Sequence, residues 1–581
     1  MCGIAGQLNL NKELKQNLLI NNSLSHRGPH NKNSIRLRKN LIFYHTRLKI
    51  IDLTNESNQP MSSENSRYTI IYNGELYNFK EIKSELEKKG HFFNTNGDTE
   101  VFLKGFIAYG INFFKKINGI FAVSIYDKKL NCIYFARDFI GVKPLYYTFD
   151  SNSFSFSSEL KTLVKIQKNK SKLNKKFLNE FLIYKYITGS ETLVKNIFKF
   201  DPGKIYKLDL NKKYIKLEKK KYYSFKEKKN SDNLDDATEK FNDLFTKSIN
   251  LQLQSDANLG VQLSGGIDST LITEFATKHK KIKHLFFSYF KNFKKDEFKY
   301  AQKVSNKLNL KFKKIEHTKK FFNRSFRNSI YFLDEPLNHP HSVAIYQISK
   351  VAKKNVSVLL TGEGADELFF GYERYKKILK KKLNKFDLIK NGAFLRSKLD
   401  LELYSKFSLE TYGDPHFNRL KMFEKIQVEN KIKRFQVFET QSHLQSLLLR
   451  SDKMMMANSI EARVPFLDKY IYDYALNLPN DIKKNYNQKL VLKKILLNKG
   501  YSTQFVNRKK IGYIIPLNDW IIKKKNFDNE LITENLLNLF DKKNLENLSF
   551  QLERNKNLYS NAKIYWLMRN LDQFIDIFEL N

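Results

Sequence analysis

In the first third of the chain, hydrophobic residues gather in short runs that favour β-strands. The runs are rich in β-branched and aromatic side chains, and they occupy residues 41–44, 68–72, 120–126, 133–136 and 153–157. Residues 81–89 instead have the apolar spacing of a helix, and Gly90 is placed to end it. Asn73-Gly74 and Asn118-Gly119 are turn signals, so we expect the chain to reverse at both places. The pattern predicts a β-rich domain with few helices.

In the second half, short apolar runs alternate with helical stretches. Runs at residues 260–263, 284–289 and 356–360 each precede a helical pattern, which begins near Ser269, Glu297 and Asp366 respectively. Repetition of strand and helix predicts a parallel sheet of the α/β class. From Asn430 onwards the pattern is mainly helical.

The chain has 581 residues, more than one hydrophobic core usually holds. A lysine-rich, weakly patterned stretch follows residue 168; Pro202-Gly203 marks a turn within it, and residues 226–236 have the composition of a linker. The predicted divisions are a first domain over 1–205, a linker over 206–236, a second domain over 237–530 and a helical C-terminal extension over 531–581.

Composition adds a large positive charge. Hydrophobic residues make up 41% of the chain and aromatic residues 14%, enough for a packed core. The formal net charge of +43 suggests a nucleic-acid or membrane partner when taken alone. Lysine is, however, spread along the whole chain together with Asn, Ile, Phe and Tyr, as AT-rich codon usage would produce. We therefore predict no specific nucleic-acid partner, no membrane partner, and a positive field that attracts anionic substrates.

Cysteine usage and the N-terminus bear on the compartment. Cys2 and Cys132 are the two cysteines, too few for a disulfide scaffold. The N-terminus has no basic region followed by a long apolar run, so we expect no secretory signal. With no apolar run of ~18 residues, we expect a cytoplasmic protein. Cys132 lies in an apolar, strand-like run and is predicted to be a core thiol.

Cys2 is the first candidate for chemistry. A small side chain at position 2 permits removal of the initiator methionine, which leaves Cys2 with a free α-amine. That amine, with a reference pKa of ~7.7–8.0, can act as the base for the neighbouring thiol, whose reference pKa is ~8.5. Taken alone, the residue is more simply an inert N-terminal cysteine.

A series of short segments changes that assessment. In order they are residues 1–6, His26-Arg27-Gly28-Pro29, His45-Thr46-Arg47-Leu48, residues 72–78, Gly97-Asp98-Thr99-Glu100, Ala136-Arg137-Asp138, residues 141–147 and Ser157-Ser158-Glu159-Leu160. Together they resemble the class II, N-terminal-nucleophile glutamine amidotransferase domain of the asparagine synthetases, over nearly all of residues 1–205. The resemblance implies an αββα sandwich and a thioester formed on Cys2.

The resemblance also implies roles for individual residues. Arg47 would bind the α-carboxylate of glutamine, a task that suits a planar guanidinium. Asp98 would bind the α-ammonium group, with Glu75 nearby, and Asn73 and Gly74 would form the oxyanion hole. The implied glutamine-binding set is completed by Leu48, Lys49, Ile50 and Ile51. One position departs from the family pattern of Arg-Gly-Pro-Asp, since this chain has His30 after Pro29.

A second candidate site lies at residues 260–270. A strand there runs into a loop of small residues, Ser264-Gly265-Gly266, and then into a helix that carries Asp268 and Ser269. Such a loop presents backbone N–H groups to an anion, and it lacks the Gly-Lys ending of a Walker A loop. It resembles the pyrophosphate loop of the ATP pyrophosphatases, which cleave ATP between the α and β phosphates.

Further segments extend this resemblance to the synthetase half of the asparagine synthetases, over roughly residues 235–520. They are residues 360–372, Asp334-Glu335-Pro336, Arg450-Ser451-Asp452-Lys453-Met454, residues 461–468, Lys489 and residues 508–513. Two departures are mild: Thr361 stands where Ser is common, and Phe370 where Gly is frequent.

The resemblance implies an adenylating site that uses ATP and Mg²⁺. Asp268 and Asp366 would hold Mg²⁺ with pyrophosphate, and Glu363 would assist formation and amination of the acyl-adenylate. The remaining implied ATP-binding residues are Leu263, Ser264, Gly265, Gly266, Ser269, Ser288, Thr361, Gly362 and Lys489. His339-Pro340-His341 has no third ligand in the sequence, so it is interpreted as a loop and not as a metal site.

The leading hypothesis is glutamine-dependent synthesis of asparagine from aspartate through a β-aspartyl-adenylate. Ammonia would pass internally between the two sites along neutral small or apolar side chains, and a homodimer is the family expectation. Three alternatives stay open. The same machinery could amidate another carboxylate, such as a sugar uronic acid in surface-polysaccharide assembly. The chain could be an RNA-binding adenylating protein, or a binding module without glutaminase activity.

Overall fold

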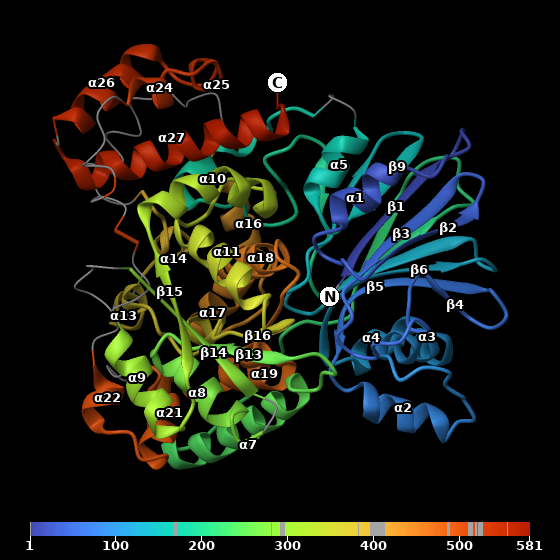
Figure 1. Cartoon of the computed structure of the whole chain (residues 1–581), viewed down its shortest axis with the longest axis horizontal. Helices are drawn as coiled ribbons and strands as arrows, with labels where there is room; N and C mark the ends of the chain where they lie inside the picture. Colours follow the sequence, from blue (N-terminus) through green and yellow to red (C-terminus); the bar gives the residue numbers. More distant parts are fainter. Residues whose placement is uncertain are drawn as a thin grey trace.

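The computed structural model describes most of the chain, in two bodies that lie side by side (Figure 1). The described residues are 2–167, 171–279, 282–290, 297–380, 383–395, 413–484, 488–508, 515–516, 520, 527–554 and 556–580. The first body is built of β-sheets and the second of a sheet surrounded by helices, while a group of C-terminal helices lies at one end of the second body (Figure 1).

Two six-stranded antiparallel sheets form the first domain. The first sheet has the order β10 (Ile197–Lys199), β8 (Tyr146–Phe149), β9 (Ser153–Ser157), β1 (Cys2–Asn9), β3 (Leu41–Arg47) and β2 (Asn31–Arg38). The second has the order β12 (Leu217–Lys221), β11 (Lys204–Asp209), β7 (Cys132–Arg137), β6 (Gly119–Asp127), β5 (Tyr68–Leu76) and β4 (Met61–Ser62).

Helices cover the outer faces of both sheets. Phe43 of the first sheet and Phe135 of the second belong to one buried cluster, so the sheets pack face to face. The first sheet is covered by α1 (Leu18–Leu24) and α5 (Leu160–Ile166); α2 (Phe79–Glu87), α3 (Asp98–Tyr109) and α4 (Phe113–Lys116) cover the second. The predicted αββα sandwich is thereby confirmed.

The five predicted strands of this domain are all present, but the two turn predictions are wrong. Asn73 and Gly74 lie inside β5, opposite Ala122 and Phe121 of β6, and Gly119 is the first residue of β6. A Cβ atom on Gly74 would lie 2.2 Å from the carbonyl oxygen of Ile120. Glycine therefore permits close approach of two strands here, which a local sequence pattern does not distinguish from a turn.

Two other predictions for this region can be compared with the structure. The helix predicted over 81–89 is α2, and Gly90, with a φ of 85°, follows it as expected. Residues 206–221, expected to begin the linker, instead lie largely in β11 and β12 and extend the second sheet.

The second domain contains a five-stranded parallel sheet, as predicted. Its order is β15 (Phe312–His317), β14 (Ile282–Phe290), β13 (Leu259–Gln262), β16 (Val358–Leu360) and β17 (Glu461–Arg463). Helices cover both of its faces. One face is covered by α7 (Leu234–Gln252), α8 (Ile267–Ala276), α9 (Phe298–Lys307), α19 (Lys469–Asn477) and α21 (Leu490–Asn498). The other is covered by α10 (Lys319–Leu333), α11 (His341–Ala352), α18 (His443–Met456) and α27 (Leu558–Phe578).

Shorter helices complete the chain, which is mainly helical after Asn430 as predicted. They are α6 (Leu178–Tyr184), α12 (Ala365–Leu368), α13 (Glu373–Lys380), α14 (Lys385–Lys390), α16 (Phe417–Glu424), α17 (Lys431–Gln441), α20 (Asn480–Lys484), α22 (Thr503–Asn507), α24 (Asp528–Leu531), α25 (Glu534–Leu537) and α26 (Lys542–Glu553). Across the described ranges, none of the helices combines the length and the apolar character that crossing a bilayer requires.

Candidate active sites

Cys2 stands at the start of β1, where backbone contacts hold it on both sides. Its N–H donates to Oδ1 of Asn73 at 3.0 Å, and its carbonyl accepts from Nε of Arg27 at 3.1 Å. Its antiparallel partner on β3 is Arg47. Burial raises the pKa of the Cys2 thiol, and the Leu48 N–H and the Arg47 guanidinium oppose that rise. Cys132, by contrast, is fully buried in the sandwich, as the sequence predicted.

Asn73 supplies a hydrogen-bond donor next to this cysteine. Its side chain is completely buried, and within the described chain its Nδ2 atom has no hydrogen-bond partner. A buried amide without a partner is costly, so such groups are rare outside functional sites. Because Oδ1 of the same side chain already contacts the Cys2 N–H, the arrangement fits a donor kept for an oxyanion.

Arg47 is fixed by a loop that folds over the site. Its guanidinium donates to Oδ1 of Asn58 at 2.9 Å, to the carbonyl of Thr54 at 2.5 Å and to the carbonyl of Asp52. The carboxylate of Asp52 in turn accepts from Ser57 at 2.7 Å and from the N–H of Asn96 at 2.9 Å. These hydrogen bonds lower the pKa of Asp52 to about 2, against the effect of burial. The loop and Arg47 therefore hold each other in place.

Asp98 is the first residue of α3 and faces the same strand as Asn73. Its Oδ2 atom accepts from the hydroxyl of Tyr72 at 3.0 Å and from the N–H of Leu76 at 2.9 Å. Burial raises the pKa of Asp98 to about 6. The structure thus brings Asp98 to the segment that carries the predicted oxyanion residues.

Other predicted glutamine-binding residues lie at the domain boundary. The carboxylate of Glu75 is 3.3 Å from the guanidinium of Arg463 on β17, and burial raises the pKa of Glu75 well above its usual range. Leu48 and Ile50 belong to the buried cluster that also contains Val261 of β13, and Ile51 packs against it. These residues contact the second domain, a placement that the sequence did not predict.

His30, the departure from the family pattern, has a clear structural partner. Its Nδ1 atom accepts a hydrogen bond of 2.9 Å from the N–H of Lys49, and its own N–H donates to the Arg47 carbonyl at 3.0 Å. Nδ1 accepts only in the neutral ring, and burial lowers the pKa of His30 in agreement with that. A neutral imidazole can therefore replace a loop carboxylate as the acceptor.

The small-residue loop lies between β13 and α8. The hydroxyls of Ser264 and Ser269 are 2.9 Å apart, and Ser264 Oγ accepts from the Gly266 N–H at 3.2 Å. Gly265 has a φ of 82°, and a Cβ atom there would lie 2.7 Å from the Ala301 nitrogen, so glycine is required. The loop is therefore closed on itself at a helix N-terminus, the geometry that favours phosphate oxygens.

Lys489 joins the two predicted metal ligands. Its ammonium group lies 2.5 Å from Asp268 and 2.6 Å from Asp366. A Cβ atom on Gly371 would lie 1.9 Å from Asp366 Oδ1 and 2.2 Å from Lys489 Cε, so a glycine is needed beside them. Phe370, where the family often has glycine, adopts a left-handed φ of 53°. The neighbouring residues thus leave space for a lysine between two carboxylates.

The same two carboxylates fit Mg²⁺. Mg²⁺ is usually bound by one or two carboxylates together with substrate phosphates and water. The ammonium group of Lys489 lies between Asp268 and Asp366, so both carboxylates face one cation. Among the described residues, no cluster of three or more His, Cys, Asp or Glu side chains offers a self-sufficient metal site. Two neighbouring carboxylates would therefore fit a Mg²⁺ ion whose coordination substrate phosphates and water complete.

Glu363 follows β16 and meets Arg450 of α18. Nη2 of Arg450 lies 3.1 Å from Oε1 of Glu363, whose side chain retains 21% of its exposure. Burial raises the pKa of Glu363, and Arg450 opposes that rise. Thr361 and Gly362 precede it, and the Thr361 N–H donates to the Arg463 carbonyl at 2.9 Å. A Cβ atom on Gly362 would lie 3.0 Å from Asp268 Cβ, which places the acidic loop against α8.

Leu263 and Ser288 lie near the carboxyl ends of β13 and β14, next to the loop. The Leu263 N–H donates to the Phe286 carbonyl at 2.9 Å. Arg508 contacts the loop directly, since its guanidinium donates to the Gly265 carbonyl. Residues 509–513 of the predicted series lie outside the described residues.

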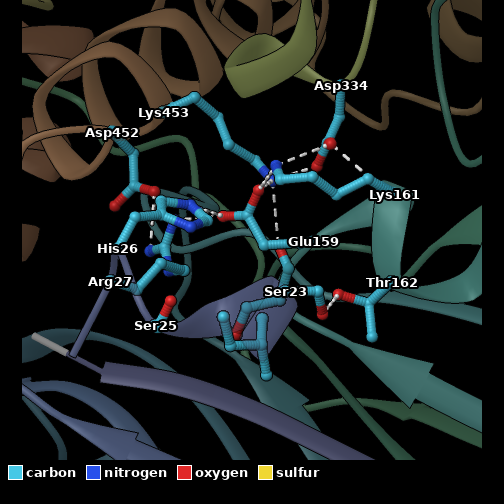
Figure 2. A network of polar contacts seen from close by, with 12 residues as sticks. Ser23, Ser25, His26, Arg27, Glu159, Lys161, Thr162, Asp334, Asp452 and Lys453 are labelled. Atoms are coloured by element: carbon cyan, nitrogen blue, oxygen red, sulfur yellow. Dashed lines mark hydrogen bonds and ion pairs between the residues drawn. The ribbon is translucent and has the colours of Figure 1, made fainter. Parts of the chain in front are cut away.

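A buried ionic network joins the two domains (Figure 2). Arg27 lies 2.7 Å from Glu159 and 2.8 Å from Asp452, and Lys453 lies 2.9 Å from Glu159 and 2.5 Å from Asp334. Lys161 contacts both Glu159 and Asp334, and Lys143 lies 3.5 Å from Asp452. All of these residues except Lys161 lie in the segments that the sequence singled out, but the sequence assigned them no role.

A hollow at the domain junction has no predicted site residue in its wall. Its volume is about 840 Å³, and its lining includes Lys226, Lys228, Lys229, Lys240 and Lys469. Asp473 and Asp232 also line it, and they accept hydrogen bonds from Tyr223 and Tyr474. The hollow is thus rich in cations and separate from both candidate active sites.

Comparison with known proteins matches the two parts of the chain to two domain families. A model of the glutamine amidotransferase domain matches residues 1–223, and the asparagine synthase model matches residues 240–573. Asparagine synthetase [glutamine-hydrolyzing] 1 of Bacillus subtilis (strain 168) is 31% identical over 571 residues, or 90% of this chain and 89% of that protein. Asparagine synthetase [glutamine-hydrolyzing] 3 of the same strain is 30% identical over 85% of this chain and 84% of that protein. A putative asparagine synthetase [glutamine-hydrolyzing] 2 of Methanocaldococcus jannaschii is 32% identical over 69% of this chain and 82% of that protein.

Proposed function

This chain belongs to the family of glutamine-hydrolysing asparagine synthetases, and we propose that it makes asparagine from aspartate, with glutamine as nitrogen donor and ATP as activating substrate. One observation carries the proposal. Helix α18 provides Asp452, which contacts Arg27 beside Cys2, and also Arg450, which contacts Glu363. A single rigid element therefore connects the nucleophile of one candidate site with the carboxylate of the other.

In the first half-reaction, the Cys2 thiol attacks the side-chain amide carbon of glutamine. The thiol proton passes to the α-amine of Cys2, which is free once the initiator methionine is removed. Nδ2 of Asn73 and the N–H of Gly74 stabilise the oxyanion. The α-amine then returns its proton to the amide nitrogen, the C–N bond breaks, and ammonia leaves while the thioester remains on Cys2. Water then hydrolyses the thioester to glutamate. Arg47 and Asp98 orient glutamine by its carboxylate and ammonium groups.

In the second half-reaction, the β-carboxylate of aspartate attacks the α-phosphorus of ATP. Pyrophosphate leaves, and the Ser264–Ser269 loop together with Lys489 stabilises its charge. Mg²⁺ held by Asp268 and Asp366 would neutralise further phosphate charge when bound. Ammonia then attacks the acyl carbon, Glu363 takes the excess proton, and AMP leaves with the pair of electrons of the acyl–oxygen bond.

Ammonia must reach the acyl-adenylate before it is protonated, since ammonium is not a nucleophile. We propose that it travels through the interior at the domain boundary. Neutral packing supports such a path, because Leu48 and Ile50 share a buried cluster with Val261 and Leu263.

Aspartate-dependent release of pyrophosphate tests the proposal. The purified chain should produce asparagine and pyrophosphate from aspartate, Mg-ATP and glutamine. Cys2→Ala should lose the reaction with glutamine and keep it with added ammonia, whereas Cys132→Ala should keep both. Pyrophosphate that depends on a sugar uronic acid and not on aspartate would reject aspartate as acceptor. Loss of both reactions in the Cys2 variant would reject the assignment of the two half-reactions to two domains.

A further inference from the structure

Lys185 follows α6 in the first domain and holds an unusual position. It adopts a left-handed backbone conformation, with a φ of 67°, and its N–H donates to the Phe181 carbonyl at 2.5 Å. A side chain other than glycine or asparagine is disfavoured there by roughly 1–2 kcal/mol. Only 6% of the residue is exposed. A lysine is therefore kept, buried and strained, where a glycine would fit more easily.

The ammonium group of Lys185 reaches into the second domain. It lies 3.2 Å from the His339 ring nitrogens and 4.2 Å from the centre of the Phe394 ring. Throughout the described ranges, no carboxylate pairs with it in an ion pair of 4.0 Å or less. Burial, together with Arg450, Arg374 and Lys563, lowers its pKa well below the usual range. Because burial disfavours the charged form of this amine, an anion within hydrogen-bond reach would stabilise the ammonium form, so the site favours binding of an anion.

His339 is held in place by contacts on both sides of its loop. Nδ2 of Asn338, the residue before it, donates to the Ser446 carbonyl on α18 at 2.7 Å. The buried side chain of Asn570 on α27 bonds to both the N–H and the carbonyl of Leu337, at 2.9 and 2.7 Å. The rings of His339 and His341 stack 5.6 Å apart. The segment predicted as a loop is thus held by a hydrogen bond to α18, the helix that carries Arg450, and its last residue, His341, begins α11.

The neighbouring cations already have carboxylate partners. Arg450 pairs with Glu363 at 3.1 Å, and Arg374 pairs with Glu439 at 2.6 Å. Both arginines act electrostatically on Lys185. Lys185 contacts His339, and the neighbouring Asn338 is hydrogen-bonded to α18, the helix that carries Arg450. An anion bound at Lys185 would stabilise the protonated form of its amine. An acceptor acid whose reacting carboxylate lies near Glu363 would place its second anionic group toward Arg450 and Lys185.

We propose that Lys185, with His339 beside it, binds a second anionic group of the acceptor acid, which is the α-carboxylate when the acceptor is aspartate. This inference rests on the proposed amidation of a carboxylate at the Glu363 site, but not on aspartate as the acid. It assigns a substrate class: acids with two anionic groups, one activated by ATP and the other held by a residue of the first domain. The first domain thereby contributes to acceptor selection as well as to ammonia supply.

Lys185→Met tests the assignment, since it keeps most of the length of the side chain and removes the amine. With ammonia as nitrogen source, the KM for aspartate should rise about 10- to 100-fold, the effect of losing a charge-assisted contact. Turnover at saturating aspartate, the KM for ATP and glutamine hydrolysis should change little. Lys195→Met is the matched control, because that lysine is exposed in the same segment. Circular dichroism and thermal unfolding establish that both variants are folded.

Two aspartate analogues separate recognition of the anion from recognition of the amine. Succinate retains both carboxylates and should compete with aspartate, whereas β-alanine lacks the α-carboxylate and should not. In Lys185→Met the difference between the two inhibition constants should become about 10- to 100-fold smaller, the same factor as the expected rise of the KM for aspartate.

Failure of the proposed function is distinguishable from failure of this inference. If the wild-type chain releases no pyrophosphate with aspartate, the asparagine proposal fails. Equilibrium dialysis then compares glucuronic acid with glucuronic acid 1-phosphate in the wild type and in Lys185→Met. Weaker binding of a doubly charged acid by the variant supports the inference. If the wild type and Lys185→Met bind aspartate, succinate and glucuronic acid 1-phosphate equally well, the inference is wrong.

Discussion

The guanidinium of Arg27 and the carboxylate of Asp452 form an ion pair of 2.8 Å between residues 425 positions apart, with both side chains fully buried. Nε of the same guanidinium donates to the Cys2 carbonyl at 3.1 Å. One arginine therefore holds the nucleophile and fixes the second domain to the first.

Replacing Arg27 by Met should destabilise the protein by about 3–5 kcal/mol, because it leaves buried carboxylates without their partner. Urea unfolding followed by fluorescence measures this loss. The control is Arg36→Met: Arg36 pairs with Glu13 at 2.6 Å, but the two side chains are 45% and 57% exposed. That variant should lose no more than about 1 kcal/mol. Equal losses in the two variants would contradict a structural role for the buried pair.

Asn73→Asp tests the oxyanion donor. Aspartate keeps an oxygen that accepts from the Cys2 N–H and removes the Nδ2 donor. Glutamine hydrolysis should fall by roughly 10²–10³-fold, the usual effect of losing one such donor. The ammonia-dependent reaction should be preserved, since Asn73 lies in the first domain. Asn94→Asp, on the same domain and exposed, should change neither rate. A glutaminase rate within a few-fold of the wild type would show that Nδ2 has another function.

Asp98 should make glutamine binding sensitive to acid. Burial raises its pKa to about 6, so below that pH the carboxyl becomes neutral and no longer attracts the α-ammonium of glutamine. The KM for glutamine should rise about tenfold for each pH unit below 6. The KM for ATP in the ammonia-dependent reaction should not rise in this way, because Asp98 does not contact ATP. Asp98→Asn should have a high KM that does not change over this range.

The sign of the stability effect provides a control. The folded pKa of Asp98 lies above its ordinary value of 3.8, so the folded state binds the proton more tightly. Ionisation above pH 6 therefore costs stability, and Asp98→Asn should be at least as stable as the wild type at pH 7. If Asp98→Asn instead has a lower melting temperature than the wild type at pH 7, its kinetic effect is due to misfolding.

Lys489→Met should impair adenylation and leave glutamine hydrolysis intact. Without the ammonium, Asp268 and Asp366 face each other and the departing pyrophosphate with no cationic side chain between them. Pyrophosphate release should fall on the order of 10²-fold, as expected for a lost electrostatic contact to the leaving group. Lys494→Met, whose lysine pairs with Asp235 at the surface, should retain the wild-type rate. A similar loss in both variants would point to a general effect of charge.

Local chemistry explains why the sequence predicted much of this protein correctly. Alternating and clustered apolar residues predicted β3, β5, β6, β7 and β9, because pleat periodicity is a property of neighbouring residues. The small residues that join β13 to α8 were recognised because a strand–loop–helix junction favours an anion. Cys2 was recognised only together with the series of segments that follows it along residues 1–205. Asn73-Gly74 was misread as a turn because its glycine permits the close approach of β6, which begins 45 positions after Gly74 in the chain.

The sequence by itself determined the two fold classes, since strand and helix periodicity depends on neighbouring residues, and it indicated the two kinds of chemistry through the order and spacing of short segments. Only the tertiary structure decided which charged residues act together. Among 103 lysines and arginines, nothing local distinguishes Lys489, Arg27 or Lys185 from a surface cation. Their partners lie more than a hundred positions away, and burial alone makes those partnerships strong, because a low local dielectric raises both the cost of an unpaired charge and the strength of a paired one.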